Sequence, residues 1–303
     1  LFAYIDQREV HHDELFLPWE EFIDLANDYG VYPRGQHPED SLRRGLEELG
    51  DHLETPVDVY LLGGGNLILR GLKDSTKDVD IVVEDGQTFL TIAESLQDLG
   101  YEERSDLEAA YNQLDPSIVV EKEGFPRWDI FVEAVAGQLQ LTPAMIERCD
   151  QSFEYGNLHV HLLSLTDIFV FKSITEREGD LEDAALIARQ ADLDWESIFQ
   201  EIKTQEDRTG QFFSFAVLDT LDVLDERHNI VAPITDRLAS YCLENALLVS
   251  LEGPKTIEDL RAELDFPDHQ IYNKLRKLEE EGQITVDRSG RLNAYQRAEL
   301  PDR

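Results

Sequence analysis

Cysteine and long apolar stretches are both scarce in this chain of 303 residues. Its 2 cysteines, Cys149 and Cys242, lie far apart and lack the close spacing of a zinc site, so we expect two buried, reduced thiols. No apolar run approaches 18 residues, and residues 1–10 lack the basic and then apolar pattern of a secretory signal. These absences predict a soluble cytoplasmic protein with no membrane partner.

Positive charge is scarce as well. The chain has 27 Lys and Arg against 64 Asp and Glu, which gives a formal net charge of -37, while its 42% hydrophobic content argues against a disordered acidic chain. Such a surface suits a high-salt cytoplasm, where screening over about 3 Å makes repulsion between acids tolerable. We therefore expect a halophilic archaeal source. A surface that imitates nucleic acid is the alternative, but the acids are spread along the whole chain.

The pattern of apolar residues divides the chain into four parts and predicts an α+β fold. Residues 1–56 have helical spacing, with one helix beginning at Pro18 and a second capped by Asp40 or Ser41. Residues 57–205 alternate strand and helix signals, as in a sheet domain with flanking helices. A helical connector is predicted at 206–235 and a separate module at 236–303.

The most informative stretch is 58–83. An apolar strand leads into Gly63, Gly64 and Gly65, where backbone amides at a strand-to-helix turn could approach a phosphate. A second apolar strand then opens with Asp78 and Asp80. Side chains at i and i+2 of a strand share a face, so two like charges meet there unless something positive lies between them.

A third acid begins a later predicted strand. Asp129 follows Arg127 at the start of the apolar run 128–132. Two explanations are open: a buried Asp paired with Arg127, or a third metal ligand that meets Asp78 and Asp80. Three carboxylates could hold two Mg²⁺ ions, which bind oxygen and stabilise the attacking and leaving oxygens of a phosphoryl transfer.

The module at 236–303 has the order helix, turn, helix and two short strands. Thr256 is expected to cap its short helix. The stretch resembles the winged helices of many prokaryotic transcription regulators, which place the second helix in a major groove. Five basic side chains are candidates for phosphate contacts: Lys274, Arg276, Lys277, Arg288 and Arg291. A dimer or interdomain contact is the alternative role for this module.

The first motif resembles the nucleotidyltransferases of the DNA polymerase β superfamily. The match is a hydrophobic strand, Gly63 to Gly65, twelve residues, the pair Asp78 and Asp80, and then Asp129 on a separate strand. Gly65 stands where many members have Ser, which removes a hydroxyl contact to phosphate. Thr166 is predicted to cap a helix. The residues Lys172, Asp180 and Asp183 that follow resemble a segment of the minimal, AbiEii-toxin-like nucleotidyltransferases.

This resemblance, which covers about residues 57–200, implies transfer of a nucleoside monophosphate from an NTP with Mg²⁺ as cofactor. Asp78 and Asp80 would bind both metal ions, Asp129 would complete one site, and the glycines and Lys172 would contact the phosphates. Asp180 and Asp183 would orient Lys172 or accept a proton. The implied acceptor is RNA, including tRNA, or a protein, in a toxin–antitoxin or defence setting with an antitoxin or a second copy of the chain as partner. A DNA-binding regulator with an inactive nucleotidyltransferase-like domain is the second hypothesis, and transfer to a small molecule a third.

Overall fold

The computed structural model describes residues 37–104, 116–135, 139–175 and 177–298. The helix predicted after Pro18 lies outside these ranges. The chain separates into two compact units, Leu1–Leu163 and Ser164–Arg303, and each is described by itself. Both contain helices and strands, so the predicted α+β class is confirmed. The finer division into four functional parts stays a prediction.

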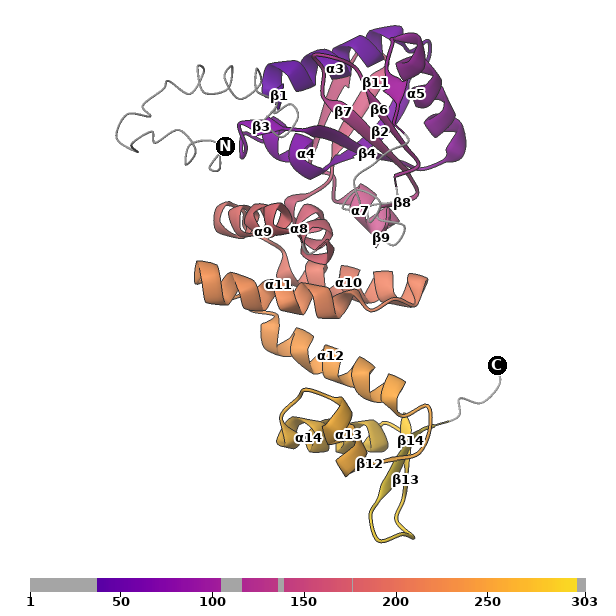
Figure 1. Ribbon diagram of the computed structural model, residues 1–303, viewed down its shortest axis with the longest axis vertical. Helices are drawn as coiled ribbons and strands as arrows, with labels where there is room; N and C mark the ends of the chain where they lie inside the picture. The colour runs from indigo at the N-terminus through magenta and orange to yellow at the C-terminus, as the bar shows by residue number, and fades with distance from the viewer. Residues whose placement is uncertain (1–36, 105–115, 136–138, 176, 299–303) are drawn as a thin grey trace, which may run out of the picture. The chain divides into compact units, whose positions relative to one another are not determined.

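A seven-stranded mixed sheet forms the centre of the first unit (Figure 1). Its inner pairs are parallel between β11 and β2, antiparallel between β2 and β4, and parallel between β4 and β7. The strands lie in the order β10 (Gln151–Tyr155), β11 (Leu158–Leu162), β2 (Val57–Leu62), β4 (Asp78–Val83), β7 (Arg127–Val132), β6 (Ile118–Glu121) and β5 (Glu102–Glu103).

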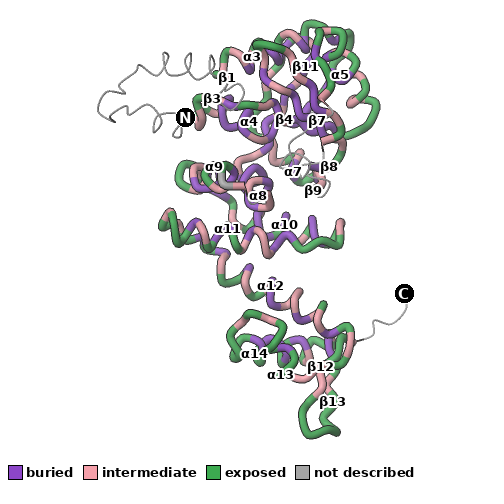
Figure 2. Tube along the Cα trace, viewed as in Figure 1, coloured by how far each residue is buried: buried purple, intermediate pink, exposed green. Residues whose placement is uncertain are grey.

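Two longer helices pack on one face of this sheet. They are α3 (Glu39–His52) and α5 (Gly86–Asp98), and their leucines and isoleucines join alternate residues of the strands in one hydrophobic core. Figure 2 shows the buried residues concentrated along β4 and β7. The remaining elements of the unit are short: β1 (His37–Pro38), α4 (Gly63–Leu69), β3 (Ser75–Thr76), β8 (Ala134–Val135), β9 (Leu139–Gln140) and α7 (Pro143–Glu147).

Strand alternation assigns the other residues of the sheet to its second face. Val79 and Ile81 of β4 belong to the core with α3 and α5. Asp78 and Asp80 alternate with them and therefore project from the opposite face. This second face is where the predicted acidic residues lie.

The second unit begins with five helices and ends in a smaller module of two helices and three short strands. The five helices are α8 (Leu165–Ile174), α9 (Glu178–Gln190), α10 (Trp195–Thr209), α11 (Phe213–His228) and α12 (Thr235–Ser250). The chain continues through β12 (Lys255–Thr256), α13 (Ile257–Glu263), α14 (Asp268–Glu280), β13 (Ile284–Asp287) and β14 (Ala294–Arg297). β14 pairs with β12 and β13 in an antiparallel sheet, and residues of α12, α13, α14 and β13 share a hydrophobic core.

Helix starts show where local pattern succeeds and where it fails. Thr256 caps α13 with a reciprocal capping box to Asp259, as predicted. The predicted caps of α3 and α8 are wrong. Pro38 precedes α3 without a side-chain cap, and Ser164, not Thr166, accepts the amide hydrogen bond at the start of α8. No helix in the described part of the chain is long and apolar enough to cross a membrane.

Candidate active site

The glycine turn lies directly against the acidic strand. β2 ends at Leu62 and α4 begins at Gly63, whose φ of 63° is a conformation that L side chains rarely adopt. A Cβ on Gly63 would come within 2.0 Å of Oδ2 of Asp80, and one on Gly64 within 2.4 Å of Oγ1 of Thr76. Both positions therefore need glycine, because β3 and β4 approach the turn so closely.

Gly65 differs from its two neighbours. A Cβ there would lie 3.5 Å from Leu61 and 3.8 Å from Leu42, which are ordinary contacts with core side chains. A serine at this position would therefore extend from the backbone toward the core. The structure gives Gly65 no close approach that demands glycine.

This difference yields a matched pair of variants. We expect Gly63→Ala to lower the free energy of unfolding by about 1–3 kcal/mol, because a left-handed backbone and a collision with Asp80 combine. Gly65→Ala should be neutral or stabilise by up to about 1 kcal/mol, because it removes freedom from the unfolded chain. Urea unfolding followed by circular dichroism measures both. Equal losses in the two variants would contradict this account of the turn.

The three predicted acids meet on one face of the sheet. β4 and β7 are parallel, with Asp80 opposite Asp129 and Asp78 opposite Arg127. Residues opposite each other on adjacent strands project from the same face. Asp129 is only 1% exposed, whereas the side chain of Asp78 is 18% exposed. We call Asp78, Asp80, Asp129 and Arg127 the acid cluster.

Arg127 binds Asp129 and Asp78. Its Nε and one terminal nitrogen (Nη2) donate to the two carboxylate oxygens of Asp129, each at 2.7 Å, and Nη2 also lies 3.0 Å from Oδ1 of Asp78. The sequence left a paired Asp129 and a metal-binding Asp129 as alternatives, and the structure shows the pair. The positive group that the closely placed acids require is thus part of the chain itself.

The fit of metal ions to this arrangement can be judged from the donor set. Within the described ranges, no group of three His, Cys, Asp or Glu side chains is arranged to hold a metal ion. Both oxygens of Asp129 already accept hydrogen bonds from Arg127. The acid cluster therefore does not fit a site in which all three carboxylates bind metal while Arg127 stays in place. The two predicted Mg²⁺ ions stay a prediction.

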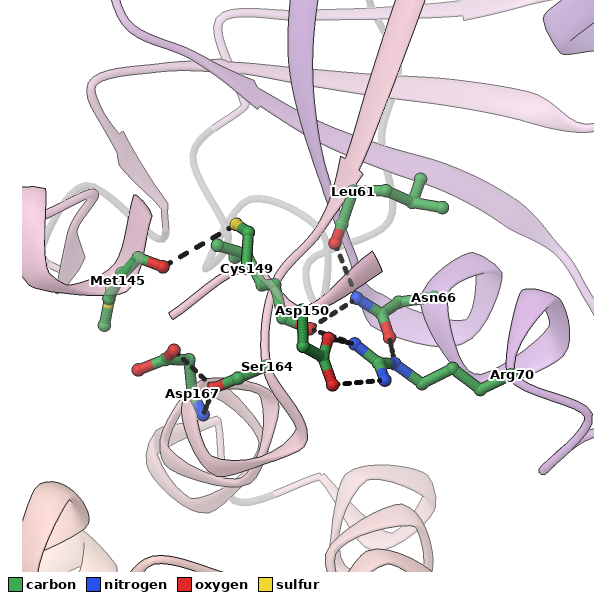
Figure 3. A network of polar contacts seen from close by, with 9 residues as sticks. Leu61, Asn66, Arg70, Met145, Cys149, Asp150, Ser164 and Asp167 are labelled. Carbon is green, nitrogen blue, oxygen red and sulfur yellow. Dashed lines mark hydrogen bonds and ion pairs between the residues drawn. The ribbon is translucent and has the colours of Figure 1, made fainter. Parts of the chain in front are cut away.

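A second polar network, which the sequence did not indicate as a site, anchors α4 (Figure 3). Nδ2 of the fully buried Asn66 donates to the carbonyls of Leu61 and Leu163 at 2.8 and 3.0 Å. Arg70 donates to Asn66 at 2.8 Å and to Leu163 at 3.0 Å, and forms an ion pair with Asp150. The hydrogen bonds that Arg70 donates to Asp150 lower the pKa of that carboxyl group. The sequence does contain a sign of this network: Asn66 and Arg70 are polar residues four positions apart, next to an otherwise apolar helical stretch.

Lys172, Asp180 and Asp183 come together within the second unit. The ammonium group of Lys172 on α8 pairs with Asp180 and, at 3.0 Å, with Asp183, both on α9. Asp180 also accepts hydrogen bonds of 2.6 Å from Thr175 and Arg177. Burial opposes ionisation of Asp180, but Lys172 and Arg177 outweigh it and lower its pKa. The contact of Lys172 with a triphosphate stays a prediction.

Lys172→Met tests this cluster through its pH dependence. A lowered folded-state pKa contributes stability above the ordinary value of 3.8, and that contribution is lost as the pH falls below it. We expect the variant to lose about 2 kcal/mol at pH 7, less than a fully broken buried pair because Arg177 remains. Its difference from the unchanged protein should shrink below pH 3.8. Lys255→Met, which breaks an exposed pair with Glu263, is the control and should cost under about 1 kcal/mol. A pH-independent difference would contradict the assignment.

The predicted nucleic-acid residues fall into two groups. Lys274 is only 8% exposed and pairs with Glu244 on α12 at 3.0 Å, so its side chain packs inside the unit instead of reaching outward. The other four side chains, Arg276, Lys277, Arg288 and Arg291, are exposed. Three of them lie near acids: Arg276 near Glu280, Lys277 near Glu281 and Arg288 near Glu279.

The two cysteines are free thiols, as predicted, although only Cys242 is fully buried. Burial raises the pKa of Cys242 to about 11, so its thiol stays protonated at neutral pH. Cys149 is half-buried and lies 3.6 Å from the carbonyl oxygen of Met145 (Figure 3).

Comparison with known proteins adds little to this geometry. No protein-family profile and no curated protein matches the sequence. Among solved structures, a crystal structure described as a "putative nucleotidyltransferase from H. pylori" aligns with 66% of this chain and 88% of that chain. The two share 12% identity with a TM-score of 0.30, and an overlap that weak assigns neither a family nor an activity.

Proposed function

We propose that the protein transfers a nucleoside monophosphate from an NTP to an acceptor hydroxyl and releases pyrophosphate. The single observation that carries this proposal is the placement of the turn at Gly63 directly against Asp80, with Asp78 and Asp129 on the same face of the sheet. A glycine turn beside clustered carboxylates is suited to phosphoryl transfer, because no side chain of the turn covers its backbone amides.

The chemistry asks three things of the chain's own residues. The backbone amides of the glycine turn bind the phosphates of the NTP. The acceptor hydroxyl forms a bond to the α-phosphorus as the bond to pyrophosphate breaks, and its proton passes to a carboxylate of the acid cluster. Arg127 offsets part of the negative charge that would otherwise repel the nucleotide from Asp78 and Asp129.

The family resemblance of the motif supplies the finer parts of the proposal. They are an Mg²⁺ requirement, a triphosphate contact from Lys172, an RNA (including tRNA) or protein acceptor, and a role in toxin–antitoxin or defence systems. Asp180 and Asp183, which hold the ammonium group of Lys172, would then set its position. An antitoxin or a second copy of the chain is the corresponding partner, and a high-salt cytoplasm is the corresponding setting.

The test is label transfer. Purified protein is incubated in molar KCl with Mg²⁺, each of the four labelled NTPs and total RNA, and label is followed into RNA and into protein separately. We expect transfer that Asp78→Ala/Asp80→Ala abolishes and that the exposed-acid control Asp74→Ala leaves intact. Absence of transfer, or transfer that the double variant leaves unchanged, would overturn the proposal.

Binding of duplex DNA by residues 236–303 is the second candidate function. The observation that favours it is the order α12, β12, α13, α14 and the β13–β14 hairpin, which is the order of a winged helix. Arg276 on α14 and Arg291 in the segment between β13 and β14 are exposed, as phosphate contacts require.

A gel-shift series at graded KCl separates this candidate from the first. We expect Arg276→Ala and Arg291→Ala each to reduce the slope of log affinity against log salt by about 1, as the loss of one phosphate contact does. Arg104→Ala, in the other unit, is the matched control. If no duplex shifts at any salt concentration, or all three variants behave alike, this function is excluded.

A further inference from the structure

The guanidinium of Arg127 occupies a central place in the acid cluster. It spans from Asp129 on its own strand, with two hydrogen bonds of 2.7 Å, to Asp78 on the neighbouring strand at 3.0 Å. The arrangement follows from the register, which sets Arg127 opposite Asp78 and Asp129 opposite Asp80. One side chain thereby joins two carboxylates from two adjacent strands.

This contact has the properties of a permanent one. Two parallel hydrogen bonds from one guanidinium to one carboxylate form the strongest common ion-pair geometry. Asp129 is 1% exposed and the side chain of Arg127 is 13% exposed, so both are withdrawn from water. Arginine keeps its proton at any pH of interest. For Asp129 to bind a metal ion, both of its hydrogen bonds with Arg127 would have to break inside the protein.

Charge leads to the same conclusion. The three carboxylates bring three negative charges, and Arg127 places one positive charge against Asp78 and Asp129. A guanidinium already supplies part of the positive charge that a metal ion would bring, so a second divalent cation next to it would be repelled. Buried excess charge of either sign is unfavourable.

We infer that Arg127 is a resident cation of the site and takes the place of one metal ion, and that Asp129 positions Arg127 instead of binding metal. The acid cluster then holds one divalent ion, at the side of Asp78 and Asp80. The inference concerns the site of the proposed nucleotidyl transfer, and its meaning for catalysis rests on that proposed function. The number of bound cations does not depend on turnover.

The test counts Mn²⁺ ions bound by the full chain in molar KCl, by the electron paramagnetic resonance signal of free Mn²⁺. High salt weakens binding to the acidic surface, and comparison between variants cancels what remains. We expect Asp129→Asn to bind as many ions as the unchanged protein and Asp80→Asn to bind one fewer. Loss of an ion in Asp129→Asn, or no loss in Asp80→Asn, would overturn the inference.

Arg127→Gln provides an independent arm, because removal of the resident cation should open a place for a metal ion. We expect this variant to bind one ion more than the unchanged protein. Mn²⁺ should also raise the unfolding temperature of the variant by more than it raises that of the unchanged protein. Arg104→Gln, which loses a half-exposed pair with Glu121, should do neither. A folded Arg127→Gln without the extra ion would contradict the inference, and if it fails to fold, the Asp129→Asn and Asp80→Asn counts decide.

The ion counts test the role of Arg127, and the label-transfer assay tests the proposed function, so either can fail without the other. A chain that shows the expected counts but transfers no label would contradict the proposed function and leave the role of Arg127 standing. A chain that transfers label but loses an ion in Asp129→Asn would do the reverse.

Discussion

Replacing Arg127 with methionine is expected to lower the free energy of unfolding by about 3–5 kcal/mol, the usual cost of removing one partner of a buried ion pair. The variant leaves the carboxylate of Asp129, 1% exposed, without the guanidinium that donates to both its oxygens, and Asp78 loses the same neighbour. Urea unfolding in molar KCl measures the change.

Two further variants make this result specific. Arg104→Met removes a half-exposed partner from Glu121 and should cost no more than about 1 kcal/mol. The double variant Arg127→Met/Asp129→Leu should regain much of the lost stability, because the deeply buried carboxylate of Asp129 is then removed as well. If Arg127→Met costs no more than Arg104→Met, the guanidinium contributes little to the folded state.

Asp80→Asn should lower the rate of label transfer by roughly 10²–10⁴-fold, the range over which a positioned acid or base acts. Asp80 is the carboxylate that lies against the glycine turn, and asparagine keeps its shape while removing its charge. Single-turnover transfer at saturating NTP measures the effect, with circular dichroism to show that the variant is folded.

Asp74→Asn, an exposed acid that precedes β3, is the matched control and should retain the rate. Equal rates in Asp80→Asn and Asp74→Asn would show that the acid cluster serves the fold and not the reaction. A rate lost in Asp80→Asn together with its folded signal would require the comparison to be repeated with Asp80→Glu.

Much of the acid cluster could be predicted because strand alternation is local. The spacing of Asp78 and Asp80 alone places them on one face, and Arg127 and Asp129 have the same spacing. The contact between Arg127 and Asp78, by contrast, depends on which residue of β4 lies opposite Arg127. That register is a long-range property, set by packing between strands, and no local pattern contains it.

The burial of Lys274, by contrast, could have been predicted from spacing. It lies three residues after Ile271 and four before Leu278, on the stripe that α14 buries. Helix starts were harder to predict, because a cap needs an extended backbone at one position as well as a suitable side chain. Ser164 meets that requirement with ψ of 152°, whereas Thr166 already lies inside the helix.

The burial of Arg127 and Asp129 also bears on how the protein responds to its medium. A chain with a net charge of -37 changes its surface repulsion with every change in ionic strength, because counter-ions gather around exposed acids. Counter-ions have little access to a contact between side chains that are 13% and 1% exposed. Dilution of the salt should therefore increase repulsion between the exposed acids first. The contact between Arg127 and Asp129 should persist until the sheet itself unfolds.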